Sequence, residues 1–531
     1  MCVLCVGLQA DKYNIFNKVQ PLLLNINSDF RTKTVNLQYK PYSLFPSSST
    51  VDKSDYTDIL RKLFFQWSPE PGIEIVALPQ AGSYREYFRL TGSDKHAIGV
   101  YSPDKNETRA FISFTTHFRK LGLHVPEIYA SDPGNDCYLV SDLGETSLLD
   151  HLEKNRENGL PSAETLALYK QAIAELPRFQ VEACKDFDFS VCYPTGEFDA
   201  RSMRWDLNYF KYYFLRLLKV PFNEAALEDD FDTLVAYLLQ NGSSYFMYRD
   251  FQARNIMIHE DKPWFIDYQG GRRGPLQYDL ASLLFQVKAS LPYSFREEML
   301  HWYLFNLKKY IQIDEAKFID DYYGFVLIRL LQVMGAYGFR GYFERRAHFL
   351  QSIPFAVENL RWLLENVRFK IEMPELMKAL QEIAKTDILL PEVSEAGTLN
   401  VSVNSFSFKN GPPPDYSGNG GGFVFDCRAL PNPGRYDHYK KFTGIDEPVI
   451  QYLDREPAVA KFLQNVYKIV DQSVIEYRRR GFSNLQVNFG CTGGQHRSVF
   501  CAARLAAYLE EKYSIKVILH HQEMKTFRFR Q

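Results

Sequence analysis

The sequence predicts an α+β domain of two lobes, followed by a smaller α/β domain. Strand patterns dominate residues 73–140, and helical patterns dominate residues 146–386. A strand, a glycine-rich turn and a helix then follow one another over 485–512. At 531 residues the chain is also too long for one ordinary core, so two or three domains are expected.

The composition is that of a soluble globular protein, with 46% apolar and 24% charged residues. A formal net charge of -2 excludes a chain coated in basic residues, so any nucleic-acid surface must be local. Eight scattered cysteines form no disulfide framework, and a reducing cytoplasm is the expected compartment. Cys2 and Cys5 form a CxxC without a second pair at zinc spacing, so no zinc site is expected.

No membrane association is expected. The most apolar long segment, 325–339, is interrupted by Arg329 and Gln332 and is shorter than the roughly 20 residues that a bilayer requires. The first ten residues lack the basic region and the cleavage site of a signal peptide.

The first domain is expected to span residues 51–385. Residues 1–50 are expected to form an N-terminal extension that ends in a turn-rich linker. A helix over 56–67 and a strand over 73–78 lead into a turn at 80–87 that contains Gly82 and Ser83. In a kinase small lobe such a turn would lie over the phosphates of ATP, because small residues let backbone N–H groups approach, so Gly82 and Ser83 are candidates for ATP binding. The alternative is an ordinary hairpin turn, which also needs a small residue.

The next strand, 96–101, lacks the lysine that a kinase usually carries there to pair with ATP. Lys95 precedes the strand and could substitute only if the register differs. Glu107, near the start of the helix over 108–121, would be the partner of such a lysine, so the sequence leaves its role open.

Two further strands, at 125–129 and 137–140, lead to Asp142 and Leu143. A strand that ends in an acidic, glycine-containing turn is typical of a hinge between two lobes, and its backbone would face the adenine of ATP. Beyond the hinge, the clearest helical patterns cover 207–218, 231–239, 296–311 and 318–337.

The catalytic pattern lies in the stretch 246–284. Asp250 follows Arg249, Asn255 comes five residues later, and Asp267 ends a short apolar run. A hairpin of strands at 256–259 and 264–266 would bring Asn255 and Asp267 to the same metal, with Asp250 beside them. Phosphoryl transfer from ATP needs a carboxylate for the acceptor hydroxyl and oxygen ligands for Mg²⁺. The alternative is a polar loop followed by an ordinary hairpin.

Residues 51–385 resemble the aminoglycoside phosphotransferase-like kinase family. Within it, they are most similar to cell-wall sugar kinases that phosphorylate the anomeric hydroxyl of N-acetylmuramate and N-acetylglucosamine. The resemblance is carried by SYREYFRL, VPEIYA, LVSDLGETSL, YRDFQARNIM and FIDYQGGRRGPLQYDLASLL.

The resemblance implies a protein-kinase-like fold that uses ATP and Mg²⁺. It implies that Asp250 is the catalytic base, that Asn255 and Asp267 bind metal, and that Arg249 and Asp279 support the catalytic loop. Tyr248 departs from the histidine that is usual before the Arg-Asp pair. The missing lysine agrees with the sugar-kinase group, which also tends to lack it.

The second domain is expected to span 398–531, after a linker at 386–397. A strand near 399–403 and a long helix over 458–480 precede the strand 485–489, the turn GCTGGQHRS and the helix 499–512, and a last strand covers 516–520. Free backbone N–H groups and a helix N-terminus would converge on an anion there, and Arg497 would add a bidentate donor. The alternative is a tight turn whose glycines only permit close packing.

Cys491 and Arg497 also fit the C-x5-R pattern of cysteine-dependent phosphatases. Gly490 stands where those enzymes carry histidine, and no general-acid loop can be assigned.

Residues 398–531 closely resemble the C-terminal domain of the RNase adapter RapZ, through SFSFKNGPPP, FDCRALPNPG, FTGIDEPV and GCTGGQHRSV. In that family the domain binds glucosamine-6-phosphate and a small regulatory RNA. The implied phosphate pocket consists of Cys491, Thr492, Gly493, Gly494, His496, Arg497, Ser498, Asp426, Arg428 and Asn432.

The sequence therefore predicts an ATP- and Mg²⁺-dependent kinase for a hydroxyl of a cell-wall amino sugar, acting in cell-wall sugar recycling, with a sugar phosphate bound in its second domain. The alternative is an RNA-binding regulatory adapter whose kinase fold only senses nucleotide. The tail residues Lys525, Arg528 and Arg530, with His520 and His521, could contact RNA phosphates or form an ordinary solvated terminus.

Overall fold

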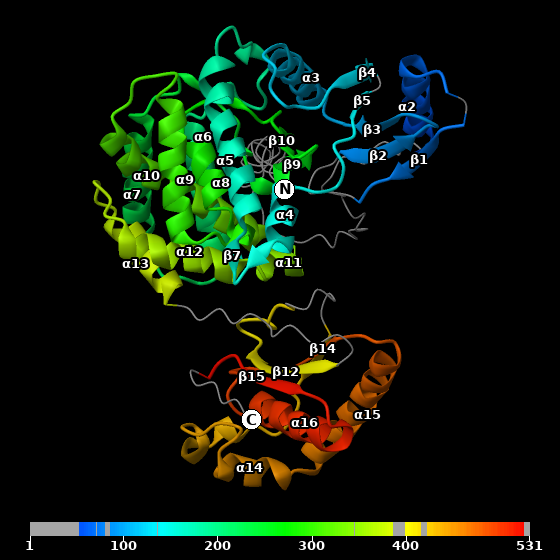
Figure 1. The fold of residues 1–531 in the computed structure, drawn as a ribbon. Helices are drawn as coiled ribbons and strands as arrows, with labels where there is room; N and C mark the ends of the chain where they lie inside the picture. The colour runs from blue at the N-terminus through cyan, green and yellow to red at the C-terminus, as the bar shows by residue number, and fades with distance from the viewer. Residues whose placement is uncertain are drawn as a thin grey trace, which may run out of the picture. The chain divides into compact units, whose positions relative to one another are not determined.

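Figure 1 shows the computed structural model of the chain. The expected N-terminal extension (1–50), the expected linker (386–397), Gly82 and Ser83 lie outside the described residues, as do Cys2, Cys5 and the tail arginines. The chain divides into two compact units, one with residues up to 336 and 355–385, the other with 337–354 and the residues from 386 on. The predicted domain boundaries stay a prediction. The described residues are 53–70, 72–79, 85–134, 136–344, 346–385, 399–415 and 422–524.

The smaller lobe of the first unit is an antiparallel sheet with the order β1-β2-β3-β5-β4. Helix α2 (Lys53–Trp67) packs on one face of it, where Leu60 and Phe64 share a core with Phe88 and Leu90. Helix α3 (Lys105–Lys120) begins after Asp104, whose carboxylate accepts hydrogen bonds from two N–H groups of the first turn. The strands are β1 (Glu74–Ala77), β2 (Glu86–Thr91), β3 (His96–Tyr101), β4 (Ile128–Asp132) and β5 (Cys137–Ser141).

The larger lobe is mostly helical (Figure 1). Within it, β9 (Ile256–His259) and β10 (Lys262–Phe265) form the predicted hairpin, and β8 (Tyr245–Met247) pairs with β11 (Arg272–Gly274). The helices are α4 (Leu148–Lys154), α5 (Ala163–Pro177), α6 (Ala200–Phe210), α7 (Glu224–Leu239), α8 (Gln277–Leu284), α9 (Tyr293–Leu307), α10 (Glu315–Tyr337), α12 (Ile353–Asn366) and α13 (Pro374–Ala384). Short elements are β6 (Arg156–Glu157), β7 (Leu160–Pro161), the π-helical turns Arg178–Glu182 and Lys211–Leu215, and the 3₁₀ turns Phe189–Val191, Ala253–Asn255 and Val287–Ala289.

Two helices of this lobe begin earlier than predicted, because their capping residues lie before the apolar pattern. The helix predicted at 207–218 begins at Ala200, where Asp199 accepts a hydrogen bond from the Ser202 N–H, and it continues as a π-helical turn after 210. The helix predicted at 231–239 begins at Glu224 after the cap Asn223.

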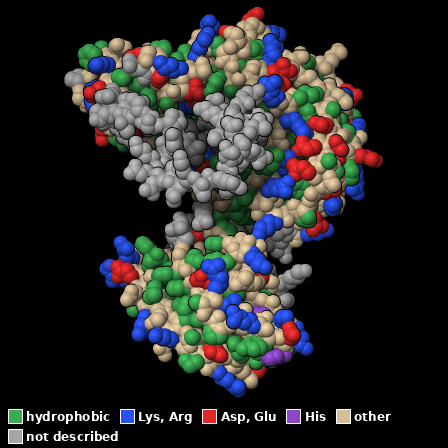
Figure 2. Space-filling view, turned by 180° about the vertical axis from the view of Figure 1, so that it is seen from behind, with side chains coloured by type: hydrophobic (Ala, Val, Ile, Leu, Met, Phe, Trp, Pro, Cys, Tyr) green, Lys and Arg blue, Asp and Glu red, His purple; other side chains and the backbone are tan. Residues whose placement is uncertain are grey.

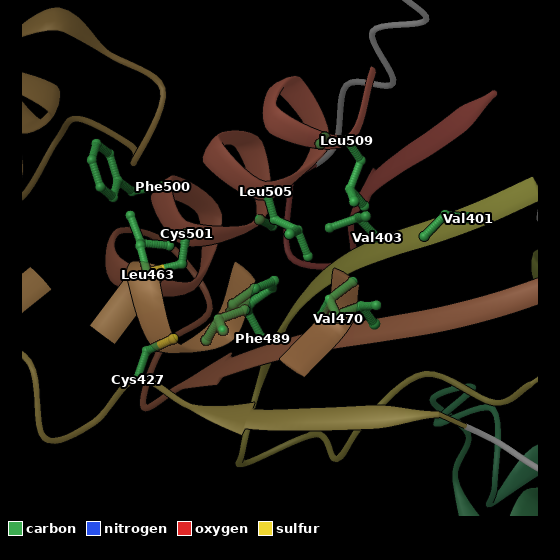
Figure 3. Close-up of a cluster of buried hydrophobic side chains, with 14 of the residues drawn as sticks. Val401, Val403, Cys427, Leu463, Val470, Phe489, Phe500, Cys501, Leu505 and Leu509 are labelled. Carbon is green, nitrogen blue, oxygen red and sulfur yellow. The ribbon is translucent and has the colours of Figure 1, made fainter. Parts of the chain in front are cut away.

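The second unit is built around an all-parallel sheet with the order β13-β14-β12-β15. Leu505 and Leu509 of one helix and Val470 of another meet strand side chains such as Val403 and Phe489 in its core (Figure 3). The strands are β12 (Asn400–Ser407), β13 (Phe423–Asp426), β14 (Asn484–Cys491) and β15 (Val517–His521), and the helices are α14 (Glu447–Asp454), α15 (Pro457–Arg479) and α16 (Arg497–Tyr513). Residues 337–354 carry the π-helical turn Gly338–Phe343 and α11 (Ala347–Leu350), and 3₁₀ turns cover Pro433–Arg435 and Asp437–Tyr439.

The predicted order of a two-lobed α+β domain and a smaller α/β domain is confirmed. On the face drawn in Figure 2, acidic and basic side chains are interspersed, in keeping with the small net charge. Among the described residues, no helix combines the length and the apolar character that crossing a bilayer requires.

Candidate functional site

The catalytic loop connects β8 to the β9–β10 hairpin and gathers three of the predicted site residues. The Asn255 side-chain amide donates to the backbone oxygen of Asp250 at 2.9 Å and to Oδ2 of Asp267 at 3.4 Å. The backbone of the hairpin continues this connection, since the Ile266 N–H donates to the Asn255 carbonyl at 3.0 Å. Asp250, Asn255 and Asp267 thus lie together at the base of one hairpin, as the spacing predicts.

Asp279, at the start of α8, holds the backbone of this loop. Its two carboxylate oxygens accept the N–H groups of Tyr248 and Arg249, each at 2.8 Å, and Gln180 donates to it at 3.2 Å. These bonds help to stabilise a left-handed backbone at Arg249, where φ is 77°, a conformation that is rare for residues other than glycine. Burial raises the pKa of Asp279 to about 7, although the bound N–H groups act to lower it.

Arg249 points away from Asp250, toward α6. Its Nη2 contacts both carboxylate oxygens of Asp206, at 3.2 and 3.3 Å, and its guanidinium lies over the rings of Phe198 and Tyr278. Because both charged groups are buried, removal of one partner would leave the other charge uncompensated. The pair joins the catalytic loop to α6.

Asp250 has one carboxylate oxygen without a hydrogen-bond partner among the described residues. This oxygen, Oδ1, is buried. Buried polar atoms are nearly always paired, so an unpaired carboxylate oxygen at a loop is a natural place for a substrate hydroxyl.

The donor set around Asp267 fits a hard divalent cation. The amide nitrogen of Asn255 makes both of these hydrogen bonds, and Oδ1 of Asp267 also accepts from Gln269 at 2.7 Å, so the Asn255 oxygen and the remaining lone pairs of the Asp267 carboxylate would be the donors for a cation. The described residues hold no cluster of three or more His, Cys, Asp or Glu side chains suited to a metal ion. Mg²⁺ is commonly held by one or two protein oxygens and completed by substrate phosphates and water, and this pair matches that pattern.

Glu107 has a partner that the sequence did not indicate. The guanidinium of Arg85, directly before β2, binds its carboxylate through Nη2 at 2.8 Å and through Nε at 3.3 Å. Lys95 does not take this place, because its ammonium lies 4.9 Å from the centre of the Trp67 ring. Burial raises the pKa of Glu107, and the charge of Arg85 opposes that shift.

The predicted hinge is held by side chains of the small lobe. Asp142 accepts from Nε of Arg89 at 2.7 Å and from the Gly144 N–H at 2.9 Å, and Leu143 is buried. The Asp142 carboxylate therefore helps to fix the shape of the hinge, and the contact of the hinge backbone with ATP stays a prediction.

An open pocket of about 390 Å³ is lined in part by Glu197 and Asp199, the chain neighbours of Phe198, whose ring lies under Arg249. Thr195 on its wall accepts a hydrogen bond from Arg272 at 2.9 Å. The pocket is lined by Phe189, Thr195, Gly196, Glu197, Asp199 and Arg273.

In the second unit, the predicted anion loop joins β14 to α16. Gly494 has a φ of 67°, and a Cβ there would come within 2.9 Å of the Ser407 backbone nitrogen, so glycine is required for this turn. Nη1 of Arg497 donates to the carbonyl oxygens of Arg428 and Leu430, at 2.8 and 3.1 Å. Nε of Arg497 is buried and makes no hydrogen bond with the described residues.

Cys491 lies at the base of this loop, with its sulfur 3.1 Å from Oγ of Ser498. Burial alone would raise the pKa of its thiol. Hydrogen bonds from Ser498 and from the Gly494 backbone, with the charge of Arg497, outweigh burial and lower the pKa.

Of the other predicted pocket residues, some are exposed and some are hydrogen-bonded within the protein. Thr492 and Gly493 are exposed at the tip of the loop. The ring of His496 contacts the Tyr439 carbonyl oxygen at 3.1 Å. Asn432 accepts from the Gly434 N–H at 3.2 Å. Asp426 and Arg428 are exposed and pair with each other at 2.7 Å.

Comparisons with known proteins match two separate parts of the chain. Residues 74–313 match the phosphotransferase enzyme family, and residues 399–525 match the RapZ C-terminal domain. Two relatives are nucleotide-binding proteins of Thermotoga sp. (strain RQ2), 38% identical over 133 residues, and of Staphylococcus epidermidis, 39% identical over 191 residues. The aligned parts are 25% and 34% of this chain, and the chain spans only 45% and 60% of these two relatives.

The structure of choline kinase from Streptococcus pneumoniae is similar at 13% identity with a TM-score of 0.37, over 58% of this chain and 99% of that one. By its family matches, the chain is similar to the phosphotransferase enzyme family in one part and to the RapZ C-terminal domain in another, and these parts form a protein-kinase-like domain and a smaller α/β domain.

Proposed function

We propose that the first unit transfers the γ-phosphate of ATP to a hydroxyl of a cell-wall amino sugar such as N-acetylmuramate or N-acetylglucosamine. The observation that carries this proposal is the meeting of Asp250, Asn255 and Asp267 at one hairpin base. The match of residues 74–313 to the phosphotransferase enzyme family supports the reaction class, and the choice of sugar rests on the sequence resemblance.

Asp250 acts on the acceptor. Its unpaired Oδ1 accepts a hydrogen bond from the acceptor hydroxyl, orients that oxygen toward the γ-phosphorus and takes its proton as the new bond forms. The Asn255 oxygen and the Asp267 carboxylate would hold Mg²⁺, which neutralises the triphosphate when it is bound. Asp279 and Arg249 keep the loop in the shape that this chemistry needs.

The pocket beside Phe198 is a candidate for acceptor recognition. Its wall carries two carboxylates, a hydroxyl and a guanidinium, of which Asp199 also caps α6, Thr195 also binds Arg272 and Glu197 also accepts from Ser243, so an amino sugar would use their remaining lone pairs and N–H groups. The acetamido group and ring hydroxyls of the sugar would be its ligands.

An acceptor screen tests the proposed reaction. The intact chain is incubated with ATP, Mg²⁺ and a panel of hydroxylated acceptors, and ADP release is measured together with the phosphorylated product. We expect transfer to N-acetylmuramate or N-acetylglucosamine, which ends when Mg²⁺ is removed with EDTA. If none of the panel is phosphorylated, the kinase proposal is wrong.

For the second unit we propose binding of a sugar phosphate at the loop 491–498. Backbone N–H groups and the N-terminus of α16 face the loop, and Nε of Arg497 is an unpaired buried donor beside it. Binding of glucosamine-6-phosphate, measured by calorimetry on the intact chain, should be lost in Arg497→Ala and kept in the exposed control Arg480→Ala.

A phosphatase is the second candidate for this loop, because the lowered pKa of Cys491 and its contact with Ser498 suit a nucleophilic thiolate. Hydrolysis of an aryl phosphate that stops in Cys491→Ser would support it. For the RNA-adapter alternative, the tail residues Lys525, Arg528 and Arg530 lie outside the described residues, and burial lowers the pKa values of His520 and His521. Salt-sensitive RNA binding by the intact chain would favour it.

A further inference from the structure

One face of β2 carries two arginines that lie at opposite ends of the expected nucleotide site. Side chains alternate between the faces of a strand, and Phe88 and Leu90 face the core with α2. Tyr87 and Arg89 therefore share the other face, and Arg85 joins them, since its Nη1 donates to the Tyr87 hydroxyl at 3.0 Å. Four residues of strand separate the two arginines by about 13 Å, which is on the scale of a nucleoside triphosphate.

The contacts of the two arginines show which end of this face lies at the hinge and which lies at Asp267. Arg89 binds the hinge through Asp142, at 2.7 Å, whereas Nη2 of Arg85 lies 3.5 Å from Oδ1 of Asp267. The face thus runs from the hinge, where the base of ATP is expected, to Asp267, where its phosphates are expected.

Arg85 is held firmly in place. Its Nε and Nη2 bind the two oxygens of Glu107, and only 4% of the residue is exposed. Burial would lower the pKa of Arg85, but Tyr87, Glu107 and Asp267 together raise it well above its usual value, so the group stays charged.

The geometry leaves part of this guanidinium for a ligand. Of its five N–H groups, two bind Glu107 and one binds Tyr87. The contact with Asp267 is at the outer limit of a hydrogen bond, and the second Nη1–H has no acceptor among the described residues.

We propose that Arg85 binds the phosphates of the nucleotide in place of the lysine that β3 lacks, with Glu107 holding it in position. The inference rests on the proposed kinase function, since it takes ATP as the ligand. A guanidinium held edge-on by a carboxylate presents its remaining N–H groups to phosphate oxygens in a fixed geometry. The contacts of Arg85 support the replacement. Tyr87, to which Arg85 donates, lies opposite Val100 of β3, and Glu107, which Arg85 binds, is the carboxylate with which a lysine of β3 would pair.

Binding measurements on the intact chain separate a phosphate contact from a structural brace. Calorimetry compares AMP-PNP with Mg²⁺ against adenosine, for the wild type, Arg85→Gln and Arg85→Lys. We expect Arg85→Gln to weaken AMP-PNP binding by about 10- to 100-fold, as for the loss of charged hydrogen bonds, and to change adenosine binding by less than about twofold. Arg85→Lys keeps the positive charge but lacks the planar guanidinium. Its affinity for AMP-PNP should lie between those of the wild type and Arg85→Gln.

Arg89→Gln is the matched control, because it removes the same charge from the same face at the hinge end. This variant should weaken the binding of AMP-PNP and of adenosine by the same factor, so that the ratio of the two affinities stays unchanged. An equal loss for both ligands in Arg85→Gln would show that Arg85 only braces the lobes, and an unchanged AMP-PNP affinity would also overturn the inference. If Arg85→Gln does not fold, the inference is tested with Arg85→Lys alone. An Arg85→Lys variant that binds AMP-PNP as tightly as the wild type would contradict a bidentate contact of Arg85 with phosphate.

A failure of the Arg85 inference can be distinguished from a failure of the kinase proposal. A wild type that binds AMP-PNP through Arg85 but phosphorylates no acceptor contradicts only the proposed reaction. A wild type that does not bind AMP-PNP at all contradicts both proposals.

Discussion

At the scale of residues, the candidate site depends on buried polar groups whose partners are fixed by the backbone. Asn255 links Asp250 to Asp267, and Asp279 holds the two N–H groups that precede Asp250. Replacing the Asp279 carboxylate by a group that donates would leave a backbone N–H of the loop buried without an acceptor, which is costly.

We expect Asp279→Asn to lower the free energy of unfolding by about 1–3 kcal/mol at pH 8, since its amide must turn an NH₂ group toward a backbone N–H. Urea unfolding measures this difference. Asp261→Asn is the control, because Asp261 is exposed and has a φ of 58°, which asparagine also adopts. Equal stability of the two variants would contradict the role given to Asp279.

The sequence alone identifies only part of this site. Asp250, Asn255 and Asp267 can be found because they lie within one hairpin, whose spacing limits where their side chains reach. Arg85, Gln180 and Asp206 cannot be found in this way, since their partners lie 22 to 182 residues away in the chain. For Arg85 a signal was present, because the lysine missing from β3 left Glu107 without a partner.

At the scale of elements, the helices and strands that position the site are set by local signals. Asp104 caps α3 and so fixes the first turn that carries Glu107, and the glycine at 494 permits the turn between β14 and α16. Local signals also explain the errors, since the helices at 207–218 and 231–239 were placed by apolar spacing while their caps, Asp199 and Asn223, lie several residues earlier.

Strand β15 gives the second unit a dependence on pH. Burial, together with the charge of His520, lowers the pKa of His521 to about 4, whereas an unfolded histidine has a pKa near 6.5. The unfolded state therefore binds the proton more tightly, so the stabilising contribution is present above pH 6.5 and is lost as the pH falls toward 4. Ser405 contacts the ring at 2.8 Å and keeps it in this position.

Between pH 7 and pH 4.5, we expect the free energy of unfolding of the wild type to fall by about 1–2 kcal/mol more than that of His521→Gln. This value is smaller than the full pKa shift implies, because the ring is partly exposed. Chemical unfolding at a series of pH values measures this difference. Lys516→Gln, at the exposed residue directly before β15, serves as the control. Parallel pH profiles for the wild type and His521→Gln would rule out this source of acid sensitivity.

At the scale of the whole molecule, the chain combines two units with separate cores and separate candidate sites. The core of the second unit is built from its own sheet and helices, as Figure 3 shows. The length of the chain is the reason why more than one domain is expected, because a single core of this size is rare and each unit must bury its own apolar surface. Function follows from the sites rather than from the fold, and the central claim concerns the one around Asp250.

The most direct test of this claim compares the wild type with Asp250→Asn by ³¹P NMR in the presence of ATP, Mg²⁺ and the amino-sugar acceptor. We expect a sugar phosphate to form with the wild type and to form about 10² to 10⁴ times more slowly with the variant, while AMP-PNP binds both with similar affinity. A variant that phosphorylates the acceptor at the wild-type rate would contradict the assignment of Asp250 as the catalytic base.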